Sequence, residues 1–105
     1  MMNTALFDKE GFLTQQDAWN QEMAFAIAEA EGIALTDAHM EIINTLREFY
    51  HQHEVAPANR PFVKLIKNTY GPEKGNSIYL MTLFPESPAK LAAKIAGLPK
   101  PANCL

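Results

Sequence analysis

The chain contains one cysteine, Cys104, which stands next to the last residue of the sequence. Gly97, Pro99 and Pro101 precede it, and glycine and proline at this spacing end a helix and leave the following residues extended. At about 3.1 Å per residue for a polyproline-like segment, the eight residues after Gly97 span roughly 25 Å. Proline also limits the conformations that are lost when a partner captures such a segment. The spacing therefore predicts an arm with a nucleophile near its tip, and Cys104 is the candidate catalytic residue.

Two lysines accompany this thiol in the sequence. Lys94 and Lys100 add positive charge that favours the thiolate, which is the form that attacks sulfur. Little of an unperturbed thiol is ionised at neutral pH, so we expect a partner's pocket to complete the activation. The alternative interpretation is an ordinary C-terminus with an incidental cysteine, and the spacing alone leaves both open.

Composition narrows the class of protein. With 105 residues, 48% of them hydrophobic and 20% charged, the chain is expected to fold as one globular domain. A net charge of −3 argues against strong non-specific binding of nucleic acid. A single cysteine excludes an internal disulfide and a zinc site built from thiolates, and a free thiol suits a reducing compartment. Because the sequence has neither a signal-peptide pattern nor a membrane-length apolar run, we expect a cytoplasmic protein without a membrane partner.

Capping residues and helix breakers divide the chain into short elements; the caps are Asn20, Thr36 and Ser87. Together they predict five helices, at about 21–31, 37–53, 58–70, 73–84 and 88–97. The apolar side of the first helix has residues at helical spacing, namely Trp19, Met23, Ile27 and Ala30. A turn at 8–11 followed by a short apolar pair predicts a small N-terminal β-hairpin. The expected fold class is α+β and mainly helical, with a helical domain over 1–97 and a flexible arm over 98–105.

The histidines and glycines carry no recognisable catalytic pattern. His39, His51 and His53 lack the spacing of a metalloprotease motif, and no phosphate-binding glycine loop is present. No Ser/His/Asp or Cys/His set is specified either. We therefore expect neither a metal nor a cofactor.

Three cations form one stripe on the third predicted helix. Arg60, Lys64 and Lys67 lie at i, i+4 and i+7, opposite the apolar side of that helix. Such a stripe is most often a solvated helix face; the functional interpretation is a docking surface for an acidic protein or for RNA phosphate. The second and third helices also permit a helix-turn-helix DNA-binding regulator, against which the overall negative charge argues.

Longer sequence motifs carry a resemblance to a known family. These motifs are EAEGI at 29–33, REFY at 47–50, APANRPFVKLIK at 56–67, YGPEKGNSIYLMTLFPESPAK at 70–90 and KIAGLPKPANCL at 94–105. Together they resemble the DsrC/TusE family, which comprises the gamma-type protein of dissimilatory sulfite reductase and the tRNA 2-thiouridine synthesizing protein E. The resemblance covers nearly everything after Asp8, and the penultimate cysteine is part of it.

This resemblance implies a small β meander packed on helices, and a mobile arm whose cysteine takes up persulfide sulfur from a partner. The sulfite-reductase branch has a second arm cysteine eleven residues before the first, where this chain has Ala93. Without a resolving thiol Cys104 cannot close an internal di- or trisulfide, whereas a persulfide relay needs only one thiol. Because the N-terminus is short, we expect the first strand or two of the meander to be missing.

The chain is therefore interpreted as a sulfurtransferase of the persulfide-relay type, closest to the thiouridine branch. The resemblance implies an upstream sulfur-relay complex as donor and a tRNA 2-thiouridylase as acceptor, and it leaves direct contact with tRNA open. The alternatives are a sulfur carrier in dissimilatory or oxidative sulfur metabolism and, from another class, the helix-turn-helix regulator.

Overall fold

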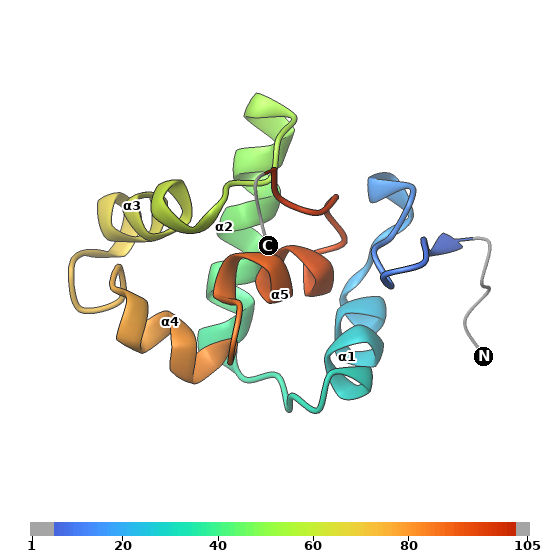
Figure 1. Cartoon of the computed structure of the whole chain (residues 1–105), viewed down its shortest axis with the longest axis horizontal. Helices are drawn as coiled ribbons and strands as arrows, with labels where there is room; N and C mark the ends of the chain where they lie inside the picture. Colours follow the sequence, from blue (N-terminus) through green and yellow to red (C-terminus); the bar gives the residue numbers. More distant parts are fainter. Residues whose placement is uncertain (1–5, 103–105) are drawn as a thin grey trace.

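The computed structural model describes residues 6–102, which include five α-helices and the short 3₁₀ helix η2. These elements are η2 (Gln16–Ala18), α1 (Gln21–Ala30), α2 (Asp37–His53), α3 (Asn59–Tyr70), α4 (Ser77–Leu83) and α5 (Pro88–Ile95). α5 packs against each of the other four α-helices and lies at the middle of the molecule in Figure 1. The mainly helical fold and the array of five short helices are therefore as predicted.

The central place of α5 follows from its small side chains. Ala89, Ala92 and Ala93 are at most 1% exposed, and Ile95 beside them is fully buried. Since the distance between packed helices depends on the side chains at the contact, an alanine-rich helix lets its neighbours approach closely on several sides. Larger apolar residues of the surrounding helices then fill the core, including Ile42, Ile43, Leu46, Phe62, Ile66 and Leu80.

Side-chain caps explain where three of the helices begin; Asn20 and Thr36 were predicted as caps, whereas Asn76 was not. Asn20 and Asn76 each accept a hydrogen bond at 2.8 Å from the backbone N–H three residues later, and Thr36 caps α2 in the same way. Ser87 occupies the cap position of α5, but its side chain makes no capping hydrogen bond. Pro88 at the first position of the helix is the remaining start signal there.

The fourth helix begins later than predicted, at Ser77 and not near residue 73. Residues 71–76 instead form a turn that packs against α3. A Cβ atom on Gly75 would lie 2.1 Å from Cα of Lys67, so only glycine fits at this close approach. The glycine that weakened the predicted helix is therefore needed for a contact between two backbones.

The predicted N-terminal β-hairpin or meander is wrong for the residues that the structure describes. No strand is present in residues 6–102; Phe7 and Leu13 form one isolated antiparallel bridge. The turn between them does form, because Oδ1 of Asp8 accepts hydrogen bonds from N–H of Glu10 and of Phe12, both at 2.9 Å. Because η2 begins at Gln16, few residues remain after Leu13 to continue the pairing. A short two-stranded pairing is also only weakly stable by itself.

None of the helices in the described range combines the length and the apolar character that crossing a bilayer requires.

Candidate functional site

The predicted nucleophile, Cys104, lies outside the described residues, but the segment that leads to it is described as far as Ala102. Residues 98–102 follow α5 without helix or strand. Leu98 is 1% exposed and Pro101 is buried, while Lys100 is exposed. This part of the predicted arm therefore packs against the helical body; the division at residue 97 stays a prediction.

Both lysines predicted to support the thiolate are paired with carboxylates. Nζ of Lys94 lies 3.3 Å from Oε2 of Glu31, and Nζ of Lys100 lies 3.2 Å from Oε1 of Glu10. Lys94 also lies over the ring of Phe12, with 5.2 Å between Nζ and the ring centroid. In this arrangement each cation is already partly neutralised, so their support of a thiolate stays a prediction.

The three predicted docking cations lie together on α3, and we call them the basic surface. Arg60, Lys64 and Lys67 are all exposed, and none of them forms a salt bridge with another described residue. Such unpaired cations on a chain of net charge −3 concentrate positive potential on one helix face. This is the electrostatic condition for docking an acidic partner.

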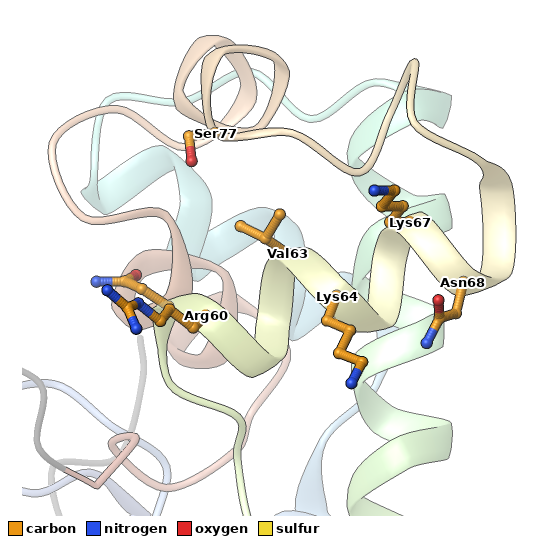
Figure 2. Close-up of a pocket in the computed structure, with 7 residues that line it drawn as sticks. Arg60, Val63, Lys64, Lys67, Asn68 and Ser77 are labelled. Atoms are coloured by element: carbon orange, nitrogen blue, oxygen red, sulfur yellow. The ribbon is translucent and has the colours of Figure 1, made fainter.

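The basic surface borders a shallow hollow of about 480 Å³ between α3 and the start of α4. Asn59, Val63, Asn68 and Ser77 complete its lining. Figure 2 shows the cations spread along α3, with Val63 pointing toward Ser77 and Lys64 pointing away from it. Because the cations do not converge on one point, the arrangement suits an extended acidic surface better than a single small anion.

Two residues that contact the end of α5 were not predicted from the sequence as site residues. Nε1 of Trp19 donates a hydrogen bond to the carbonyl of Ile95 at 2.9 Å, and Nη1 of Arg47 donates to the carbonyl of Ala96 at 2.7 Å. The sequence assigns Trp19 to the apolar side of the first helix, but it lies just before α1 with an extended backbone. Local periodicity cannot reveal either contact, because the partners are far apart along the chain; only the place of Arg47 in the REFY motif marked it.

Histidine plays a structural role in this fold. His39 is 7% exposed, its Nδ1 accepts from N–H of Thr36 at 3.1 Å, and its Nε2 lies 2.8 Å from the carbonyl of Leu83. Both ring nitrogens are therefore used within the protein. Across residues 6–102, no three residues of the His, Cys, Asp and Glu types come together to hold a metal ion.

The comparison with known proteins gives this geometry a context. A family model described as DsrC like protein matches residues 2–105. The chain belongs to the DsrC-like protein family.

Relatives of this DsrC-like chain include a protein of Haemophilus influenzae named sulfurtransferase TusE homolog. The two are 53% identical over 98 residues, which are 93% of this chain and 90% of the relative. The NMR structure of DsrC from Allochromatium vinosum is 44% identical, with a TM-score of 0.86 over 94% of this chain and 88% of that one. The oxidised gamma-subunit of the dissimilatory sulfite reductase from Archaeoglobus fulgidus is 40% identical, with a TM-score of 0.80 over 94% of this chain and 90% of that one.

The DsrC-like fold and the relationship to sulfurtransferases are thus both as the resemblance implied. Ala93, where the resemblance led us to look for a second thiol, is 1% exposed in α5 and its carbonyl accepts from N–H of Leu98 at 2.9 Å. An inert methyl group fills this position, so Cys104 remains the one thiol of the chain.

Proposed function

We propose that this DsrC-like chain is a sulfur-relay protein that carries sulfur on Cys104, for the 2-thiolation of wobble uridine in tRNA. The relationship to a named sulfurtransferase, 53% identical over 90% of that protein's length, is the observation that carries the proposal. Sulfur transfer by a relay needs a nucleophile, and this sequence contains only one thiol. Cys104 is therefore assigned the catalytic role.

The chemistry is two successive exchanges at sulfur. The Cys104 thiolate attacks the outer sulfur of a donor persulfide; the donor S–S bond breaks and the donor leaves as a thiolate. An acceptor thiolate then attacks the outer sulfur now held on Cys104, which leaves as a thiolate in turn. No external oxidant or reductant is consumed, because each step replaces one S–S bond by another. In this proposal the upstream sulfur-relay complex is the donor and a tRNA 2-thiouridylase is the acceptor.

Intact-mass analysis tests the assignment of Cys104. The full-length protein, incubated with the sulfur-loaded upstream complex, is expected to gain a single sulfur atom that a thiol reductant removes. Cys104→Ser is expected to gain none. A protein that gains no sulfur from any persulfide donor, or a Cys104→Ser variant that gains it equally, would contradict the proposal.

A carrier for dissimilatory or oxidative sulfur metabolism is the second candidate, favoured by the TM-score of 0.86 to DsrC. Two observations place it second: the lower identity to that protein, 44% against 53%, and alanine at position 93. Sulfur passed from loaded Cys104 to a sulfite reductase, and not to a tRNA 2-thiouridylase, would reverse the order. The helix-turn-helix alternative gains no support from these relatives, nor from the net charge of −3.

For the basic surface we propose docking of an acidic protein partner of the relay. Besides its three cations, the hollow is lined by Val63, and exposed apolar residues follow on α4, where Ile78 is 81% and Met81 is 43% exposed. Ser77 and Met81 are four residues apart, so they share a face of α4. Cations next to apolar side chains fit a protein surface that has acidic groups around an apolar contact.

Charge reversal at a single lysine tests this docking. Lys64→Glu is expected to lower the association rate with the sulfur-loaded donor, and to make it less sensitive to salt, because steering by opposite charge is lost. Lys9→Glu is the matched control, since Lys9 is exposed and lies outside the hollow. Equal effects of the two variants would contradict docking here. Salt-dependent binding of tRNA that is lost in Lys64→Glu, with donor binding unchanged, would instead assign the surface to RNA.

A further inference from the structure

The end of α5 is closed by side chains from distant parts of the chain. The last carbonyls of a helix have no partner within it and must find one elsewhere. Here N–H of Gly97 bonds the carbonyl of Lys94 at 3.1 Å, and N–H of Leu98 bonds that of Ala93 at 2.9 Å, which is the Schellman arrangement. The carbonyls of Ile95 and Ala96 remain without a partner in the backbone. Both residues are fully buried, so water is an unsuitable partner.

Trp19 and Arg47 bond these two carbonyls and also contact each other. The indole donates to Ile95 and the guanidinium donates to Ala96, as described above. The guanidinium carbon lies 4.1 Å from the centroid of the Trp19 ring, and Nη2 donates to the carbonyl of Gln16 at 3.2 Å. Arg47 therefore joins α2, the segment before α1 and the end of α5 at one point.

The charge of Arg47 is held without a carboxylate among the described residues. Burial lowers the pKa of the guanidinium from its ordinary value, but arginine stays protonated in proteins. The negative end of the α5 dipole and the face of the indole ring stabilise the cation. A guanidinium suits this place because its planar N–H groups can reach two carbonyls while its face stacks on the ring.

Gly97 completes the arrangement. Its φ angle is +73°, and a Cβ atom there would lie 2.5 Å from Cδ1 of Trp19. The indole ring therefore sits directly on the backbone at the residue where the chain turns out of α5. We call Trp19, Arg47 and Gly97 the root clamp, because the next residue, Leu98, begins the segment that leads to Cys104.

We propose that the root clamp positions the Cys104 segment for sulfur transfer, with Trp19 and Arg47 as positioning residues. This inference rests on the proposed relay function. The clamp acts through the backbone: it determines the point and direction in which the chain leaves α5 at Leu98. Leu98, which is 1% exposed, and the Lys100–Glu10 pair continue that path along the body. A thiol that starts from a fixed point meets a docked partner with fewer orientations to lose.

The sequence itself supplies the reporters for a test, since it holds one tryptophan and one cysteine. A nitroxide spin label on Cys104 reports the motion of the segment, and energy transfer from Trp19 to a thiol-linked acceptor reports their separation. Arg47→Met removes the N–H donors and keeps much of the apolar stem. We expect a more mobile label on Cys104 in Arg47→Met than in the labelled protein without this substitution. We also expect a broader distribution of distances between Trp19 and the label. Arg47→Lys, which keeps one donor and the charge, is expected to restore part of the order.

Sulfur transfer provides the second readout. With sodium polysulfide as donor, Arg47→Met and the unmodified protein are expected to load Cys104 at the same rate, because the thiol is unchanged. With the sulfur-loaded upstream complex, transfer is expected to fall on the order of tenfold, because the docked geometry is lost. Leu80→Ala is the control for lost stability, since Leu80 is fully buried and lies outside the clamp.

A label as ordered in Arg47→Met as in the unmodified protein would overturn the inference. A loss of transfer no larger than in Leu80→Ala would also overturn it, because the effect would then be one of stability alone. These outcomes are separate from failure of the relay function: if no donor loads Cys104 in the unmodified protein, the relay is wrong, while the label still decides whether the clamp orders the segment.

Discussion

At the scale of single residues, the glycines of this protein are required for different reasons, either for backbone conformation alone or also for packing. Gly32 and Gly97 both follow a helix and both have positive φ, +77° and +73°. A Cβ atom at Gly32 would meet nothing within 4 Å, whereas at Gly97 it would meet the Trp19 ring. The first glycine is thus required by backbone conformation alone, and the second also by packing.

This pair predicts a difference in stability. Gly32→Ala is expected to lower the free energy of unfolding by about 1 kcal/mol, which is the cost of a left-handed alanine. Gly97→Ala should cost about 1–3 kcal/mol more, because the ring must move out of a packed position. Urea denaturation of both variants measures the difference, and equal midpoints would show that the indole moves away freely.

The sequence predicts the roles of single residues only where they act on their neighbours in the chain. The caps Asn20 and Thr36 and the breaker Gly97 act on neighbouring residues, so their effects could be read locally. The roles of Trp19 and Arg47 depend on carbonyls 76 and 49 residues away, and no local pattern encodes such a contact. The three cations of α3 were predicted to share a face, but the hollow beside them depends on where α4 begins.

At the scale of elements, one histidine joins the start of α2 to the end of α4. His39 completes the capping box with Thr36 and reaches the carbonyl of Leu83, and its ring meets that of Phe84 edge-on at 5.3 Å between centroids. The sequence showed His39 only as a residue without a metal-binding pattern. Its partner Leu83 lies 44 residues away, so the link required the tertiary structure.

Removing this link should separate the two helix ends. His39→Ala leaves the carbonyl of Leu83 and the N–H of Thr36 without their side-chain partner, so we expect a loss of about 2–3 kcal/mol of stability. His53→Ala is the control, because His53 is exposed at the end of α2. Chemical denaturation and amide exchange at residues 80–84 measure the effect; an equally small loss in both variants would show that the histidine link contributes little.

At the scale of the whole molecule, α5 joins the core to the segment that leads to the thiol. It contacts every other α-helix among the described residues, and only Ala96 and Gly97 separate it from Leu98. The helices were predictable because their caps and apolar spacing are local. Their arrangement around α5 was not predictable from periodicity, since apolar spacing shows which face of a helix is buried but not which other helices cover that face. The prediction of an N-terminal hairpin was wrong because a turn can be predicted from neighbouring residues, whereas the length of the strand pairing on either side of the turn cannot.

Overpacking α5 should therefore weaken the whole fold. Ala93→Val adds two methyl groups where the residue is 1% exposed, so we expect a loss of about 1–3 kcal/mol. Ala30→Val, at an exposed position of α1, carries the same helix-propensity cost without the crowding. Thermal unfolding of the two variants separates these terms, and similar midpoints would indicate unused space around α5.

The buried start of the C-terminal segment also limits the order of events in a relay. Leu98 belongs to the core, and the six residues from there to Cys104 span at most about 20 Å even when fully extended. Donor and acceptor must then bring their reactive groups into the same small volume, where two proteins of ordinary size exclude each other. Such a carrier serves them alternately, so steady-state turnover should follow ping-pong kinetics, with each partner competing against the other at high concentration.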